Sequence, residues 1–341
     1  MKTIRLKFIL PPASIAFCAL FLTSCATGKK ETTVTVVSGA ARNVTRITDA
    51  PNDEINPAVS PDGRTVAFQV FRNKQSDIWT VDSATGRSVV QVTSHPMQDI
   101  HPAWMPDSKT LVFSSDRLGS FSLWRQLASG GGGTTMITKA SEMNDFAANV
   151  SPTTTTVDIF GGSHSPVVTR KIAFTSKAVP KEMLLMSGVK QFTVYEKTMP
   201  YIWTVNVDGS ALTQLVEGVG PVWAPDGSRI AFASDISGNW DIWSIGKDGA
   251  GLTQLTDNRK HQLSPSFSPD GKWIAFSSNV SGNYDIWIMR VEGAALLTQL
   301  TTDKSEEVTP CWGADGNIYF CSNKAGNWDI WRLTPVLPES E

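Results

Sequence analysis

Residues 265–287 read PSFSPDGKWIAFSSNVSGNYDIW, and this stretch contains the pattern that decides the fold. Pro269-Asp270-Gly271 is a tight-turn sequence, because proline fixes φ near about −65° and glycine accepts a positive φ. Apolar residues alternate on both sides of this turn, and Ser281-Gly282-Asn283 marks a second turn before Asp285-Ile286-Trp287. Alternation between closely spaced turns predicts short antiparallel strands, here over residues 265–268, 273–277, 285–289 and 297–301.

The same pattern recurs along the chain as a phenylalanine followed eleven residues later by a tryptophan. The five regular pairs are Phe68/Trp79, Phe113/Trp124, Phe232/Trp243, Phe276/Trp287 and Phe320/Trp331. A sixth, stretched pair is Phe174 and Trp203, which lie 29 residues apart. Four strands per copy and a period near 44 residues predict the blades of a β-propeller. The expected fold is therefore an all-β, six-bladed propeller of four-stranded antiparallel blades.

The two ends of the repeat region predict how the ring closes. The last copy ends after its third strand, and the chain then has only residues 334–341 left. Residues 44–49, which read VTRITD, match the fourth-strand sequence LTQLTD at residues 252–257. The N-terminal segment is therefore expected to complete the last blade beside Trp331, which leaves no sheet edge open in the ring.

The turn, Ile-Ala-Phe and Asp-Ile-Trp elements over residues 43–335 resemble the repeat of TolB-type propellers. This resemblance implies a protein-binding role in the Gram-negative envelope, in its integrity or in transport, with a peptidoglycan-associated lipoprotein as one expected partner. TolB itself carries a preceding α/β domain, which we expect this chain to lack. The leading interpretation is a non-enzymatic interaction scaffold without a cofactor.

The first residues are predicted to direct export and lipidation. Residues 1–24 combine three cations with an apolar stretch too short to span a bilayer, and Leu22-Thr23-Ser24-Cys25 resembles the lipobox of bacterial lipoproteins. An ordinary secretory signal with an incidental cysteine is the alternative. Cys25 would carry the lipid (diacylglycerol, palmitate), residues 25–42 would form a tether, and residues 336–341 a C-terminal tail. Ala26 implies an outer-membrane location facing the periplasm.

Charge balance excludes one class of partner. The chain has 30 Lys and Arg against 32 Asp and Glu, and loss of residues 1–24 with their three cations leaves 27 against 32. No basic surplus exists to neutralise a phosphate backbone, so nucleic-acid binding is not expected. Contact with the membrane is expected through the lipid anchor only.

The third copy, about residues 145–216, is irregular and is where a partner loop is expected. It carries about 15 extra residues between its first and second strands and 18 between its second and third. The second insertion contains Met183, Leu184, Leu185 and Met186. Methionine-rich loops suit adaptable contacts. A local hairpin folded against the propeller is the alternative.

A polar position seven residues before each turn proline, or its equivalent, predicts a binding ring at the channel mouth. This position holds Glu54, Asp99, Asp145, Gln262 and Glu307, with Gly218 in the fourth copy. On the innermost strands these groups would form a negative funnel for a cation or a basic segment. The alternative is that each is individually solvated or accepts amides of a neighbouring blade.

Two histidines and two cysteines complete the candidate residues. His101 and His261 are assigned to the same repeat position and are expected to face the channel. Two histidines on separate blades are a weak basis for a metal site, and none is predicted. A channel-based carbohydrate-active or metal-dependent lyase or hydrolase is therefore the second hypothesis. Cys311 and Cys321 flank a turn, so a disulfide between them depends on the strand register.

Overall fold

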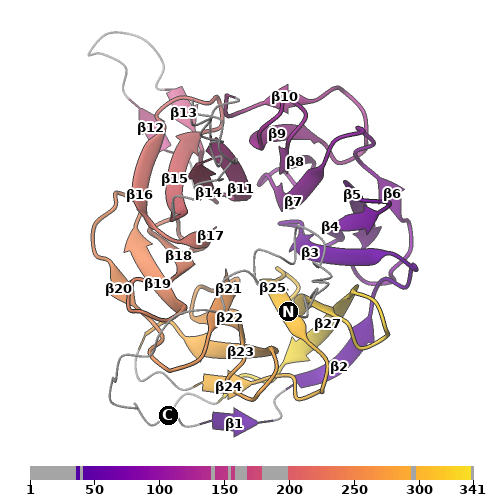
Figure 1. The fold of residues 1–341 in the computed structure, drawn as a ribbon, viewed down its shortest axis with the longest axis vertical. Helices are drawn as coiled ribbons and strands as arrows, with labels where there is room; N and C mark the ends of the chain where they lie inside the picture. The colour runs from indigo at the N-terminus through magenta and orange to yellow at the C-terminus, as the bar shows by residue number, and fades with distance from the viewer. Residues whose placement is uncertain are drawn as a thin grey trace, which may run out of the picture.

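Six antiparallel sheets stand in a ring around a central axis (Figure 1). The computed structural model describes residues 36–38, 41–139, 143–152, 155–157, 167–178, 199–292 and 297–338. The predicted all-β, six-bladed propeller is confirmed. Among these described residues, no helix is long and apolar enough to cross a bilayer.

In blades 1 to 5 the strands follow one another in sequence from the axis outward, whereas the outermost strand of blade 6 comes from the N-terminal segment. Blade 1 comprises β3 (Asp53–Val59), β4 (Thr65–Arg72), β5 (Gln75–Asp82) and β6 (Val90–Gln91). Blade 2 comprises β7 (Asp99–Trp104), β8 (Thr110–Ser115), β9 (Ser122–Leu127) and β10 (Thr135–Met136). Blade 3 comprises β11 (Met143–Val150), β14 (Lys171–Ala178), β15 (Tyr201–Asn206) and β16 (Thr213–Glu217). Blades 4 and 5 comprise β17 (Val219–Trp223), β18 (Arg229–Ser234), β19 (Asp241–Gly246), β20 (Thr253–Gln254); and β21 (Gln262–Phe267), β22 (Trp273–Ser278), β23 (Asp285–Arg290), β24 (Leu297–Gln299). Blade 6 comprises β25 (Glu307–Trp312), β26 (Ile318–Ser322), β27 (Asp329–Pro335) and β2 (Ala41–Arg46).

The ring closes through its N-terminal segment, as the sequence predicted. Strand β2 pairs antiparallel with β27, and Arg46 stands opposite Trp331. The Ile47 N–H donates to the Ile330 carbonyl at 2.8 Å, and the Ile330 N–H donates to Thr48 Oγ1 at 3.0 Å. An ion pair of 2.8 Å joins Arg46 to the buried Asp329. The first and last described strands of the ring are therefore held in one sheet.

Two further elements were not anticipated from the repeat. Strand β1 (Val36–Ser38) adds to the outer edge of blade 5, parallel to β24. A separate hairpin of β12 (Thr155–Val157) and β13 (Val167–Thr169) forms in the first insertion of blade 3 (Figure 1). Most of the second insertion, including the predicted partner residues 183–186, lies outside the described residues.

The repeated phenylalanine and tryptophan form the core of every blade. In all six blades the two residues are cross-strand partners, including the stretched pair Phe174 and Trp203. The phenylalanines are at most 1% exposed. Blade interfaces continue this core, since Phe68 of blade 1 clusters with Tyr319 and Ile330 of blade 6. Repetition of these residues is therefore explained by packing.

Three asparagines tie successive blades together on one face. Asn239, Asn283 and Asn327 lie at the same position of the loop between the second and third strands. Each donates from Nδ2 to two backbone carbonyls of the connection that leads into the next blade. Because a buried carbonyl without a partner is costly, these side chains fix the connections and the relative position of the blades.

Candidate functional site

The predicted polar ring is located in the seams between blades instead of at the channel mouth. Its five members are at most 6% exposed and are absent from the channel wall. Ser176 donates to Asp145 at 2.7 Å, Ser322 donates to Glu307 at 2.9 Å, and Arg117 pairs with Asp99 at 2.8 Å. The predicted position of Glu54, Asp99, Asp145, Gln262 and Glu307 at the mouth is therefore wrong, and these buried groups form no negative funnel.

A β-bulge in each innermost strand explains this correction. The pairing of the first strand with the second shifts at one place in all six blades, for example between Ile55 and Ala58. A bulge adds one residue and resets which side chains face each way. Residues on the innermost strands therefore do not all face the channel, and the acids before the bulge point into the seams.

The seams bury carboxyl groups from both adjoining blades. Burial raises the pKa of Glu54 to about 7, and the charge of nearby Asp329 adds to the rise. Burial likewise raises the pKa of Glu307 to about 7, with Asp285 among the charges that raise it further. In the seam between blades 4 and 5 the equivalent residue is Gln262, which shares the hydroxyl of Thr256 with Asp241. Glutamine has the shape of a protonated glutamate, so this position favours a neutral side chain.

Blade 4 has Gly218 at this position because its space is already occupied. A Cβ atom there would lie 2.5 Å from Cδ2 of Phe232 and 2.9 Å from the Ala233 carbonyl oxygen. We expect Gly218→Ala to lower the free energy of unfolding by about 2 kcal/mol through overpacking. Urea unfolding followed by circular dichroism measures the change. Gly131→Ala is the matched control, since a Cβ there meets nothing within 4 Å, and equal losses in the two variants would contradict this account.

The central channel is a cavity whose described wall residues are uncharged. Its volume is about 500 Å³, and the innermost strands of all six blades line it. Pro57, Pro102, Pro221, Pro265 and Pro310 stand around it at equivalent positions. No Asp, Glu, Lys or Arg is among the described residues of this wall. The channel therefore offers mainly apolar contacts.

Residues with positive φ form a ring in this wall, one at each bulge. Their φ angles are between 49° and 60°, and each except Ala147 precedes a proline; they are Asn56, His101, Ala147, Gly220, Ser264 and Thr309. The N–H groups of His101, Gly220 and Thr309 each donate to a side chain of the preceding blade. Such conformations are costly for non-glycine residues and tend to cluster at functional sites.

The two candidate histidines are not brought together, and their predicted equivalence is wrong, because His101 is equivalent to Ser264 and His261 to Gln98. His101 lies in the channel wall, edge-on to Phe146 with 6.3 Å between ring centroids, and burial lowers its pKa to about 4. His261 is not among the wall residues, and burial together with Lys260 lowers its pKa. Within the described ranges, no three His, Cys, Asp or Glu side chains are grouped so that they could hold a metal ion.

The candidate disulfide does not form among the described residues, because the register separates its cysteines. Cys311 stands opposite Tyr319, and Cys321 stands opposite Val308 across the bulge. The Cys311 thiol accepts from the Val59 N–H of blade 1, whereas Cys321 accepts from the Thr309 hydroxyl.

We expect both residues to remain thiols in the folded protein. Alkylation in denaturant without prior reduction should label Cys311 and Cys321 completely, as seen by peptide mass spectrometry. The same reaction on the native protein should be slow at Cys311, because burial raises the pKa of its thiol to about 11. Recovery of a peptide pair linked through the two sulfurs would contradict the register.

The family pattern described as the TolB beta propeller domain matches residues 21–191 and 252–335. TolB from Acinetobacter baumannii is 20% identical with a TM-score of 0.58, and the match covers 78% of this chain and 59% of that chain. A putative TolB from Agrobacterium tumefaciens is 18% identical, with a TM-score of 0.56 and coverages of 87% and 97%.

Enzymes share the fold as well. An oligogalacturonate lyase from Vibrio parahaemolyticus is 13% identical with a TM-score of 0.53, and the match covers 87% of this chain and 94% of that chain. No curated protein matches the sequence. At these identities the solved structures show the shared fold, whereas the family pattern covers most of the sequence. The chain belongs to the TolB beta propeller domain family.

Proposed function

We propose that the chain is a non-enzymatic scaffold of the bacterial envelope whose central channel binds an extended, uncharged segment of a partner protein. The uncharged wall of the channel is the observation that supports this proposal. Burial of a charged side chain against such a wall would be costly, whereas apolar and proline-rich segments gain contact area. A segment without charged residues therefore fits the channel best.

The shape of the wall supports an elongated ligand. All six blades contribute equivalent residues to the wall, so contacts are distributed around the axis. The N–H groups at three bulges are already bonded to the preceding blade, which fixes the wall before a partner arrives. A preformed site reduces the entropy cost of binding. Family resemblance makes a peptidoglycan-associated lipoprotein the first partner to examine.

Photocrosslinking in the native envelope tests this proposal. p-Benzoylphenylalanine would replace Ser264 in the wall and, as the matched control, Leu252, which is 43% exposed beside the outer strand β20. We expect an adduct with an envelope protein from position 264 only. Unlabelled Ser264→His chain, which copies His101 at the equivalent bulge and should narrow the channel, should compete for the partner at least fivefold less well than unlabelled wild-type chain.

Two outcomes would overturn the proposal. Identical adducts from positions 264 and 252 would show that the channel does not select the partner. Cleavage of oligogalacturonate or another glycan by the purified chain, lost in His101→Ala, would establish the enzyme alternative instead.

We also propose that Cys25 carries the lipid anchor, a residue outside the described ranges. Cys25→Ala should abolish incorporation of labelled palmitate and move the protein from the membrane fraction to the periplasmic fraction. Mass spectrometry of the wild-type N-terminal peptide provides the direct measurement. Unchanged membrane association in Cys25→Ala, or an unmodified thiol at this cysteine, would contradict the lipoprotein assignment.

A further inference from the structure

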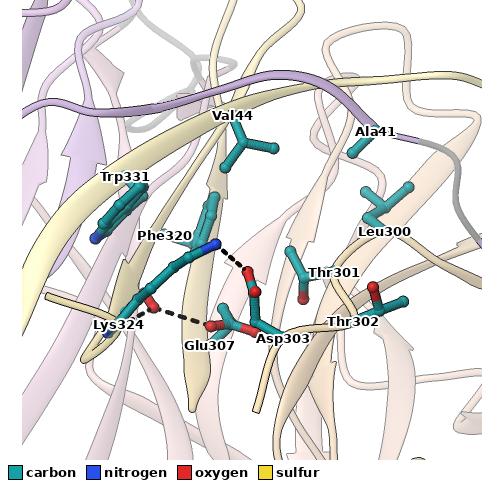
Figure 2. Close-up of a pocket in the computed structure, with 11 residues that line it drawn as sticks. Ala41, Val44, Leu300, Thr301, Thr302, Asp303, Glu307, Phe320, Lys324 and Trp331 are labelled. Carbon is teal, nitrogen blue, oxygen red and sulfur yellow. Dashed lines mark hydrogen bonds and ion pairs between the residues drawn. The ribbon is translucent and has the colours of Figure 1, made fainter. Parts of the chain in front are cut away.

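A second, smaller cavity lies in the seam between blades 5 and 6 and has a volume of about 200 Å³ (Figure 2). Phe320 and Trp331 of blade 6 and Leu300 of blade 5 form apolar walls, and Val44 of the closing strand β2 covers one side. Glu307 supplies the buried polar group of the cavity. Cavities that hold whole small molecules usually exceed about 300 Å³, so this one suits a single functional group.

The equivalent niche between blades 1 and 2 is already filled by an arginine of the chain. Arg117 lies four residues after Phe113, and its guanidinium pairs with Asp99 at 2.8 Å. Its Nε donates to Ser115 at 2.9 Å, and its central carbon lies 4.7 Å from the ring centroid of Trp124. The side chain is only 12% exposed. The niche thus holds a guanidinium between an acid, a hydroxyl and an aromatic face.

Between blades 5 and 6 the same frame is present with a lysine in place of the arginine, and the Lys324 Nζ lies 5.8 Å from the ring centroid of Trp331. Glu307, Ser322 and Trp331 take the positions of Asp99, Ser115 and Trp124. Lys324 replaces Arg117, but its Nζ pairs at 2.6 Å with Asp303, a position held by His95 in the filled niche. Figure 2 shows this pair and the Ser322–Glu307 hydrogen bond as dashed lines.

Glu307 is left with unused hydrogen-bonding capacity. Its Oε1 accepts from Ser305 and Ser322, whereas Oε2 receives no hydrogen bond from an N–H or hydroxyl group of the described residues, although Glu307 is only 1% exposed and interacts with the carboxyl group of Asp285. A buried acceptor without a donor is costly, so a donor from outside the chain would be favoured there.

We propose that this cavity binds a guanidinium group from outside the chain, held by Glu307 and Trp331 as Asp99 and Trp124 hold Arg117. A guanidinium is planar, stacks on an aromatic ring and donates to a carboxylate through a fixed fork, which an ammonium cannot do. The Lys324–Asp303 pair is no obstacle, because both side chains are more than 40% exposed and such pairs are weak. This site is separate from the channel and does not depend on the function proposed for it.

The test is titration of the full chain with N-acetylarginine methylamide, read on the indole N–H resonance of Trp331. The resonance is assigned by its loss in Trp331→Phe, and pH 8 keeps Glu307 largely ionised, since its pKa is about 7. We expect saturable binding with a millimolar Kd. Glu307→Gln, which copies Gln262 of blade 5, should weaken it at least tenfold. N-acetyllysine methylamide should bind at least fivefold more weakly than the arginine compound.

Two variants use the filled niche as an internal reference. The double variant Asp303→His with Lys324→Arg reproduces the residues around Arg117 and should fill the cavity and abolish binding. Arg117→Ala should lower the urea midpoint, and the arginine compound should restore part of that loss by occupying the vacated niche. Tighter binding of a Gly-Arg-Gly peptide than of agmatine would indicate a protein side chain as the natural ligand, and the reverse order a free cation; both support the site.

Three results would overturn the proposal: no saturable shift of Trp331 below about 10 mM, an unchanged Kd in Glu307→Gln, or equal Kd values for the arginine and lysine compounds. The double variant keeps every carboxyl group except that of Asp303 and is therefore expected to fold. Its affinity for the arginine compound tests the site even if Glu307→Gln does not fold. Persistent binding to the double variant would also place the ligand elsewhere.

Discussion

Deletion of residues 41–48 is expected to unfold the propeller at 25 °C, although every blade core is left intact in sequence. The deletion removes strand β2, the Arg46–Asp329 ion pair and the backbone bond from Ile47 to Ile330. It also removes Ile47 from its cluster with Phe68 and Ile330. Together these losses amount to about 5 kcal/mol or more, which is comparable to the whole stability of a typical domain. It also leaves β27 as an open edge.

Urea unfolding followed by circular dichroism and size-exclusion chromatography measures this effect. Deletion of residues 36–38 is the matched control, because it removes the parallel strand β1 from blade 5 without opening the ring. That control should change the free energy of unfolding by less than about 1 kcal/mol. Equal urea midpoints for the wild type and the 41–48 deletion would show that the ring is held by something other than β2.

Replacement of Glu54 and Glu307 by glutamine is expected to stabilise the protein strongly at pH 8 and much less at pH 5. Burial raises the pKa of both carboxyls from 4.5 to about 7 in the folded chain. Between pH 4.5 and 7 the folded state therefore keeps protons that the unfolded state releases, so stability falls as the pH rises. Each of these pKa shifts lowers the free energy of unfolding by about 3 kcal/mol once the carboxyl is fully ionised, and a glutamine at the same position removes this loss.

The measurement is urea unfolding at pH 5, 6, 7 and 8. The difference between the double glutamine variant and the wild type should increase with pH and level off above pH 7. The raised pKa values of Asp77 and Asp241, about 6 in each case, give the wild type and the variant the same residual slope. Gln262→Glu is the converse control and should add pH dependence of the same sign. A stability difference that is constant from pH 5 to pH 8 would contradict the assigned protonation.

The repeat and the closure of the ring could be predicted because the same sequence pattern occurs several times in the chain. Each Phe and Trp pair is weak alone, but six copies with one spacing leave few alternatives. The match between residues 44–49 and 252–257 identified the closing strand in the same way, and β2 pairs with β27 as expected.

The site was predicted less well, because side-chain direction depends on features that the repeat conceals. One bulge per innermost strand turns Glu54 and Glu307 into the seams and leaves His101 in the channel wall. A signal was available, since five bulges contain a residue followed by proline, as in His101-Pro102, an arrangement that disturbs regular pairing. The niche filled by Arg117 could be seen only once the distances were known.

Strand β1 determines how an anchored ring would stand above a bilayer. It lies on the outer edge of blade 5, at the circumference of the ring (Figure 1). With a lipid on Cys25, the eleven residues to Val36 would form a tether of at most about 40 Å that is attached at one side of the propeller. Attachment at the circumference would let the propeller tilt, so that both openings of the central channel would lie away from the lipid headgroups.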